Sequence, residues 1–334
     1  TLEQLGFGVE GEKITVPSWR SDIEHWTDLS EEVARFYGYD VIEESPLPGW
    51  SGARGLNDKQ KFKARIGELA RSVGFSEVLT YSITPQGGLR ILNPLGEDKS
   101  RMRVSMLPSM LEVLTRNRDY GNTGVKLYEI ARVYLDVGGK ELPEEREILV
   151  MGADDSNFAE FKGMAEELLY ALRIAEWRWV QAEREEYHPG ICAELTVAGK
   201  TVGVLGQVYP QTVENTFAAE LDVLKLMEVR LGDPQYKPLP RFPAVLRDLS
   251  VIVDSGVTID ALLDPAKSAG GKLLEKAEFF DLYTGSNLPE GKKSVAFSLV
   301  FRDAERSLTD DEVNPVIDGI IKALAEKLGA ELRK

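Results

Sequence analysis

The sequence predicts an α+β protein of several domains, and three observations support this fold class. The chain has 334 residues, a length that allows roughly two or three domains. Two stretches rich in proline and glycine and without apolar periodicity, residues 44–57 and 232–243, are typical of linkers. After the second stretch, strand and helix patterns follow in the order βαββαβ, which is typical of a ferredoxin-like fold. We therefore expect three domains, over residues 1–48, 57–231 and 240–334.

The composition excludes several classes of protein. With 43% hydrophobic and 28% charged residues it is that of ordinary globular domains, and no apolar run approaches the roughly 20 residues of a membrane span. A single cysteine, Cys192, excludes an internal disulfide or a multi-cysteine metal site and indicates a reducing, cytoplasmic compartment. Two histidines leave little material for zinc or acid–base chemistry. The chain starts at Thr1 without a methionine and inside a domain, so we expect it to be part of a longer protein.

The net charge of −15 argues against a protein that binds nucleic acid over its whole surface. The charge is unevenly spread, because residues 237–334 carry 14 lysines and arginines against 16 aspartates and glutamates. Screening limits the reach of exposed charges to about 8 Å at physiological salt, so this nearly neutral part can still present a local basic face. A nearly neutral domain is also ordinary, and the count alone does not distinguish the two.

The stretch from Pro17 to Asp40 carries the densest set of chemical constraints. A strand-like run ends at Pro17, since proline cannot donate a hydrogen bond to a continuing ladder. We expect Asp28 to open a helix and Glu31 to complete its capping box, with Gly38 ending the helix. The same stretch crowds four carboxylates together, at Asp22, Asp28, Glu31 and Glu32.

The three carboxylates on this helix share one face by their i, i+3, i+4 spacing. Clustered carboxylates repel one another unless a cation or a proton intervenes, and a hard divalent ion such as magnesium would relieve that repulsion. A solvated acidic helix start, favoured by the helix dipole, explains the same residues. The residues alone leave both interpretations open.

The segments PSWRSDI and DLSEEVARFYGYD resemble the signature of the β subunit of bacterial phenylalanyl-tRNA synthetases. The resemblance implies that Asp22, Asp28, Glu31 and Glu32 bind a magnesium ion (Mg²⁺) shared with an α subunit. It further implies an assembly of two α and two β subunits that attaches phenylalanine to tRNA-Phe using ATP. The tRNA-editing module of the family is not matched in this sequence, so we assign no editing to the chain.

The resemblance continues over residues 57–231, through ILNPLGEDKSRMRVSMLPSMLEVLTRN, FAEFKGMAEELLYAL, EYHPGICAELTVAGKTVGVLGQVYP and LMEVRL. It implies a class II aminoacyl-tRNA synthetase-like antiparallel sheet flanked by helices. Within this core we expect a helix that ends at Gly74, a strand over residues 78–84, a hairpin around Gly199 and a closing strand at LMEVRL.

We expect this core to be catalytically inactive. A class II active site holds ATP phosphates with two arginines, one of them in a glycine-rich motif, because arginine makes bidentate contacts to phosphate. No Gly-Xaa-Gly-Xaa-Gly-Xaa-Xaa-Arg run and no P-loop occurs, although Arg101, Arg103 and Arg132 are available. His188 would then be structural, while Lys162 fits either an exposed helix position or a buried ion pair. The alternatives are a stand-alone class II-like ligase and a general RNA-binding or assembly module.

The segments RFP, RDLS, FFDLYTG and SLTDDEV resemble the ferredoxin-fold anticodon-binding domain of the same family, which implies tRNA-Phe as a ligand. A ferredoxin-like sheet leaves one face open, and alternation along EFFDLY predicts Phe279 and Tyr283 together on that face. Such aromatics stack on unpaired bases, although they could equally belong to an interface. Candidate phosphate contacts are Arg241, Arg247, Arg302 and Arg306, and Arg247 could instead pair with the neighbouring aspartate, Asp248. We expect neither DNA nor a membrane as a partner.

Overall fold

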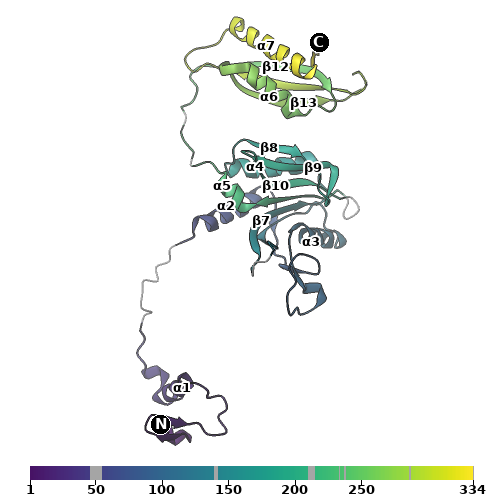
Figure 1. The fold of residues 1–334 in the computed structure, drawn as a ribbon. Coiled ribbons are helices and arrows are strands. Elements are labelled where there is room, and N and C mark those ends of the chain that lie inside the picture. The colour runs from purple at the N-terminus through teal and green to yellow at the C-terminus, as the bar shows by residue number, and fades with distance from the viewer. Residues whose placement is uncertain are drawn as a thin grey trace. The chain divides into compact units, whose positions relative to one another are not determined.

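The computed structural model describes residues 1–45, 55–138, 142–209, 215–232, 234–236, 238–285 and 287–333. By its internal contacts the chain divides into two compact units, Thr1–Gly232 and Asp233–Lys334 (Figure 1). Most of the predicted first linker, and two positions of the second, lie outside the described residues. The boundaries of the three expected domains therefore stay predictions.

The first unit begins with a small hairpin and a helix. Its elements are η1 (Glu3–Leu5), β1 (Gly8–Glu10), β2 (Lys13–Thr15), α1 (Trp26–Tyr37) and η2 (Tyr39–Val41), and β1 pairs with β2 antiparallel. The strand predicted before Pro17 is confirmed as β2. The predicted end of the helix is also confirmed, because Gly38 has a φ of 97°, a conformation that glycine adopts readily.

The start of α1 differs from the prediction. His25 is the N-cap, with the extended backbone typical of that position, and its ring nitrogen accepts a hydrogen bond from the Thr27 amide at 3.4 Å. Asp28 is the third residue of the helix and supplies the reciprocal arm of the capping box. The prediction that Asp28 opens the helix, with Glu31 as its partner, is therefore wrong by three residues.

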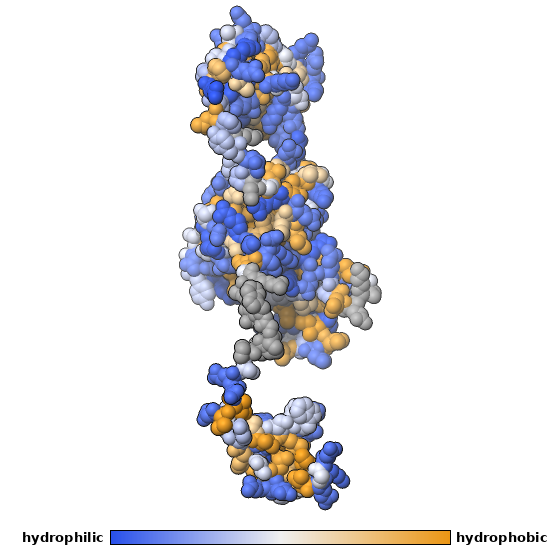
Figure 2. Space-filling model, turned by 90° about the vertical axis from the view of Figure 1, so that its left-hand side faces the viewer, coloured by the Kyte–Doolittle hydropathy of each residue, from blue (hydrophilic) through white to orange (hydrophobic). Residues whose placement is uncertain are grey.

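The helix α1 buries only one of its residues, and that residue is Glu32. Its apolar residues Val33 and Phe36 are exposed, and Figure 2 shows hydrophobic residues at the surface of this segment. The buried side of α1 is therefore held by the charged contacts of Glu32 rather than by apolar packing.

The main sheet of the first unit has seven strands, in the order β3-β6-β7-β11-β10-β9-β8. Neighbouring strands are antiparallel except β3 and β6, which are parallel. The strands are β3 (Ser76–Glu77), β6 (Lys126–Leu135), β7 (Glu144–Ala153), β8 (Trp177–Gln181), β9 (Tyr187–Val197), β10 (Lys200–Val208) and β11 (Phe217–Asp222).

Helices cover both faces of this sheet (Figure 1). The helices α2 (Asp58–Ser72) and α4 (Phe158–Ala171) pack on one face, α3 (Leu107–Asp119) packs on the other, and α5 (Val223–Glu228) follows β11. A side chain at Gly152 in β7 would place its Cβ 2.8 Å from Met110 of α3, so glycine allows this close approach. The helix predicted to end at Gly74 is confirmed as α2, since Gly74 follows it with a φ of 96°.

Two strand predictions in this unit are wrong. Residues 78–84 do not form one strand, because the carboxylate of Glu129 accepts hydrogen bonds from the amide and hydroxyl of Thr80 where a strand partner would pair. The short strand β4 (Ile83–Thr84) pairs instead with β5 (Arg101–Met102), after η3 (Glu97–Lys99), in a separate sheet. The first half of the LMEVRL segment, Leu226 to Glu228, lies in α5, because the Asp222 side chain caps a helix there by accepting from the Lys225 amide at 3.0 Å, and its second half contributes only an isolated bridge at Arg230.

The predicted hairpin around Gly199 is confirmed, since β9 and β10 pair antiparallel on either side of it. Ala198 and Gly199 both have positive φ, at 49° and 76°, as a two-residue type I′ turn requires.

The second unit has the predicted βαββαβ order. Its elements are β12 (Val245–Asp254), α6 (Ile259–Gly270), η4 (Gly271–Leu273), β13 (Leu274–Tyr283), β14 (Lys292–Phe301), α7 (Asp310–Leu328) and β15 (Glu331–Leu332). The antiparallel strand order β13-β14-β12-β15 confirms the ferredoxin-like topology. The core lies between one sheet face and the two helices, where Val251 and Phe297 pack with Leu262 and Ile320.

Among the helices in the described ranges, none is both long and apolar enough to cross a membrane.

Candidate metal site and nucleic-acid interface

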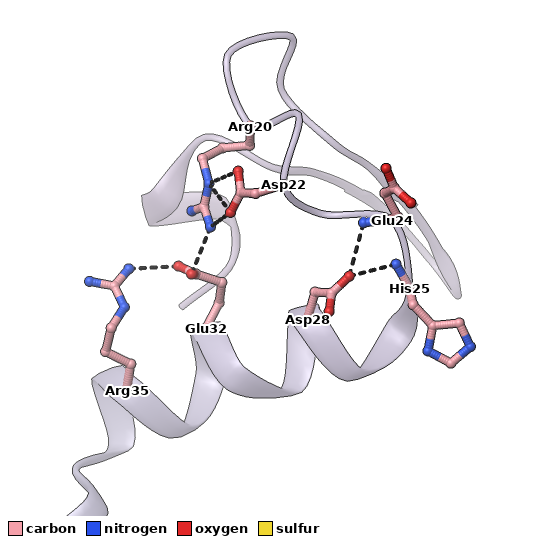
Figure 3. A network of polar contacts seen from close by, with 7 residues as sticks. All are labelled: Arg20, Asp22, Glu24, His25, Asp28, Glu32 and Arg35. Carbon is pink, nitrogen blue, oxygen red and sulfur yellow. Dashed lines mark hydrogen bonds and ion pairs between the residues drawn. The ribbon is translucent and has the colours of Figure 1, made fainter. Parts of the chain in front are cut away.

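The carboxylates predicted to bind metal are arranged around an arginine (Figure 3). The guanidinium of Arg20 contacts Asp22 through Nε at 2.9 Å and through Nη2 at 2.7 Å, and Nη2 also contacts Glu32 Oε1 at 2.8 Å. The second oxygen of Glu32 accepts from Arg35 Nη2 at 2.6 Å. These hydrogen bonds, from Arg20 first and Arg35 second, lower the pKa of Glu32 from 4.5 to about 2.

The other two predicted ligands point elsewhere. One oxygen of Asp28 accepts hydrogen bonds from the backbone amides of His25 at 2.7 Å and of Glu24 at 2.9 Å, which lower the pKa of the Asp28 carboxyl. Glu31 is exposed on the helix surface. The four carboxylates therefore do not converge on one point in this chain.

In the part of the chain that the structure describes, no three metal-ligating side chains lie close enough together to hold an ion. As arranged, the predicted set does not fit a magnesium ion, because Arg20 already neutralises Asp22 and Glu32. Sequence analysis missed Arg20. Two spacings could have indicated the ion pairs: Arg20 stands two residues before Asp22 in WRSD, and Glu32 and Arg35 have the i, i+3 spacing of neighbours on a helix.

The arginines considered for ATP phosphates are used within the core. Arg103 is buried, where its Nε donates to the Arg132 carbonyl at 2.9 Å and its Nη2 lies 3.8 Å from the buried carboxylate of Glu129. Arg101 donates to a backbone carbonyl, and the side chain of Arg132 pairs with Glu145 at 2.8 Å. Arg101 and Arg103 are thus engaged in contacts within the fold, whereas the ion pair of Arg132 lies at the surface.

His188, expected to be structural, and Lys162, left open by the sequence, both make local contacts. His188 accepts a hydrogen bond at Nδ1 from the Gly190 amide at 3.1 Å, a local contact within the strand β9. Lys162 is half-buried and pairs with Glu166 at 2.6 Å, and Glu166 also accepts from the indole of Trp179 at 3.0 Å. Lys162 is therefore the partner of an acid rather than a free helix lysine.

The prediction that Phe279 and Tyr283 share the open sheet face is wrong. Phe279 pairs with Phe297 of the core, but Asp281 pairs with Ala296, so the strand β13 has a β-bulge at Phe280. An extra residue reverses the alternation of side chains along a strand. Phe279 therefore lies on the helix-covered face and Tyr283, opposite Ser294, on the open face.

Tyr283 is already stacked. The Arg333 guanidinium lies 4.8 Å from the centre of the Tyr283 ring, and Arg333 Nη1 donates to Ser294 Oγ at 3.3 Å. Gly285 makes room for the ring, since a Cβ there would lie 2.2 Å from the Tyr283 hydroxyl. Sequence analysis missed Arg333, because only the pairing of β15 with β12 brings the last residues onto this face.

Three of the four candidate phosphate arginines make ion pairs inside the unit. Arg247 pairs with Asp310 and not with Asp248, Arg302 pairs with Glu275 at 2.7 Å, and Arg306 pairs with Glu312 at 2.5 Å. Arg241 is exposed and has no ion-pair partner among the residues that the structure describes. Among the four predicted arginines, Arg241 therefore stays the candidate for contact with RNA, and Arg333 joins it as a cation on the open sheet face.

Three protein-family models match the chain in sequence order. Residues 1–39 match the tRNA synthetase B5 domain, residues 42–223 the phenylalanyl tRNA synthetase beta chain CLM domain, and residues 240–333 the ferredoxin-fold anticodon binding domain. The chain belongs to the phenylalanyl-tRNA synthetase β-chain family. The family predicted from PSWRSDI and DLSEEVARFYGYD is thus confirmed.

Curated relatives agree with this family. The chain is 37% identical to the phenylalanine–tRNA ligase β subunit of Clostridium tetani, over 99% of this chain and 45% of the relative, and 37% identical to that of Bacillus licheniformis, over 99% and 46%. The chain thus spans about half the length of the relatives it matches. Among solved structures, a pyrrolysyl-tRNA synthetase of Desulfitobacterium hafniense aligns with 51% of this chain and 65% of its own, at 14% identity and a TM-score of 0.42.

Proposed function

We propose that this chain is the part of a phenylalanyl-tRNA synthetase β subunit that docks the catalytic α subunit and anchors tRNA-Phe. The observation that carries the proposal is the match of three β-chain and tRNA-related domains, in order, over residues 1–333. The assembled enzyme, with two α and two β subunits in the cytoplasm, would attach phenylalanine to tRNA-Phe using ATP.

The proposed contribution of residues 57–231 is a scaffold with a class II synthetase-like layout and no chemistry. The glycine-rich arginine motif is absent from the sequence, and the contacts of Arg101 and Arg103 favour structural roles. ATP would then be bound and used by the α subunit.

The proposed contribution of residues 240–334 is contact with the tRNA. Tyr283 on the open sheet face, backed by Arg333, offers a ring for base stacking, and the exposed Arg241 offers a phosphate contact. Arg247, Arg302, Arg306 and Phe279 are weaker candidates, since ion pairs engage the arginines and Phe279 lies on the other face.

Binding of magnesium by Asp22, Asp28, Glu31 and Glu32 is a proposal for the assembled enzyme alone. It requires the contacts of Arg20 with Asp22 and Glu32 to break and the carboxylates to turn toward one another.

A deletion in the complete α–β complex tests this function. Removing residues 240–334 leaves the scaffold in place, so we expect co-purification with the α subunit to survive. Affinity for tRNA-Phe and the rate of aminoacylation should both fall sharply. Full tRNA affinity in the deleted complex would show that this region serves assembly, and loss of the α subunit would contradict the scaffold role of residues 57–231.

A further inference from the structure

The cluster formed by Arg20, Asp22, Glu32 and Arg35 contains two carboxylates and two guanidinium groups. Arg20 grips Asp22 with both Nε and Nη2 and uses the same Nη2 to reach Glu32 (Figure 3). Arg20 therefore stands between the two carboxylates, at the position where a shared cation would balance them. A planar guanidinium suits this task because it makes several charge-assisted hydrogen bonds at once.

Burial makes this neutralisation necessary. Glu32 is only 7% exposed, and a buried carboxylate is costly unless it is paired and hydrogen-bonded. Both of its oxygens accept from arginine, Oε1 from Arg20 and Oε2 from Arg35. The buried charge is thus satisfied by the chain itself.

A magnesium ion and the Arg20 guanidinium cannot use these carboxylates at the same time. Magnesium requires oxygen ligands at about 2.0–2.1 Å in a nearly octahedral shell. Arg20 Nη2 lies at 2.7 Å from Asp22 and 2.8 Å from Glu32, so an ion there would meet a cation at contact distance. Repulsion between the two cations makes binding exclusive.

We propose that Arg20 is a built-in counter-ion that takes the place of a divalent cation between Asp22 and Glu32. The segment then folds without metal, and any ion that binds these carboxylates must first displace Arg20. The inference bears on the magnesium part of the proposed function but depends neither on the tRNA role nor on catalysis.

The test uses the full chain and manganese as the probe. Free manganese is followed by electron paramagnetic resonance, and paramagnetic broadening of the amides of residues 22–32 locates bound ion. We expect weak binding by the wild-type chain and binding tighter by about tenfold or more in Arg20→Gln, which removes the repelling charge and keeps a polar side chain. Arg35→Gln is the matched control, because it removes a guanidinium from Glu32 but leaves Arg20 in place, and it should gain no affinity.

Two outcomes overturn the proposal: equal manganese affinity of wild type and Arg20→Gln at these residues, or binding by neither while Arg20→Gln is folded. If Arg20→Gln does not fold, the wild-type chain decides the question. Its Arg20 Nε–H resonance should show a hydrogen-bonded signal in the presence of chelator, without any divalent ion. Absence of that signal in the chelator-treated chain would show that Arg20 is not the resident cation.

Discussion

The carboxylate cluster near the N-terminus and the open sheet face near the C-terminus have one feature in common. In each, an arginine that sequence analysis did not single out contacts the residue predicted to bind a ligand, Arg20 at Asp22 and Arg333 at Tyr283. The difference lies in the charge of the ligand. A cation that binds the carboxylate cluster must expel Arg20. An RNA that binds the open sheet face would instead be attracted by Arg333, because its positive charge attracts phosphate and its guanidinium plane can stack on bases.

The comparison shows that an arginine can either block a predicted binding site or add to it. Arg20 satisfies a buried carboxylate, so its contacts belong to the fold of the segment. Arg333 stacks on the Tyr283 ring on the sheet face without helices, and in our proposal this pair contributes to RNA recognition. Mutations in the carboxylate cluster should therefore lower the stability of the fold, and mutations on the open sheet face should weaken RNA binding.

The largest effect should come from Tyr283→Ala in the complete α–β complex. Loss of a stacking ring costs about 1–3 kcal/mol of binding free energy per base, and the salt dependence should stay unchanged because no charge is lost. Phe279→Ala is the matched control, since Phe279 precedes the bulge and lies on the other face. Filter binding of tRNA-Phe measures both variants, and an equal loss from Phe279→Ala would place the RNA elsewhere.

A pH titration should affect the carboxylate cluster and leave the open sheet face unchanged. The pKa of Glu32 is lowered to about 2 by Arg20 and Arg35, so its pairing stabilises the fold fully above the usual value of 4.5. This stabilisation should be lost as the pH falls from about 4.5 toward 2. The indole NMR signals of Trp19 and Trp26 report on the segment and should shift in this window.

Glu32→Gln should reduce this pH dependence, because the amide does not titrate, while the carboxyls of Asp22 and Asp28, whose pKa values are also lowered, keep their share of it. The stack of Tyr283 and Arg333 contains no carboxyl group, so its resonances should not follow the same curve. A common titration curve at both places would contradict the assignment of the acid response to Glu32.

The smallest effect should be that of Arg241→Ala on tRNA binding. If Arg241 contacts a phosphate, the slope of log affinity against log salt should fall by about 0.7–0.9. Arg302→Ala is the control, because Arg302 is held by Glu275 and the Phe242 carbonyl and should change stability instead. An unchanged slope in Arg241→Ala would remove this residue from the interface.

Sequence patterns predicted the ferredoxin-like unit because its signals are local and regular. Leu249, Val251 and Val253 alternate, and all three are buried as that alternation requires. The bulge at Phe280 is set by pairing with β14, a partner that alternation within β13 does not include, so the face of Tyr283 relative to Phe279 could not be predicted.

The four carboxylates were identifiable from the sequence, but their directions were not. The cluster depends on Arg20 and Glu32, twelve positions apart, meeting through a turn whose geometry no periodic pattern encodes. The same holds for Arg333, which reaches Tyr283 only after the sheet has formed.

The central claim is that this chain supplies binding surfaces and no chemistry. ATP–pyrophosphate exchange, measured with phenylalanine on the chain after rigorous removal of any α subunit, tests it most directly. We predict no exchange by the chain alone, because no complete set of phosphate-binding arginines is present and Arg103 is held inside the core. Exchange that persists in the purified chain, and that is lost in Arg103→Ala, would contradict this claim.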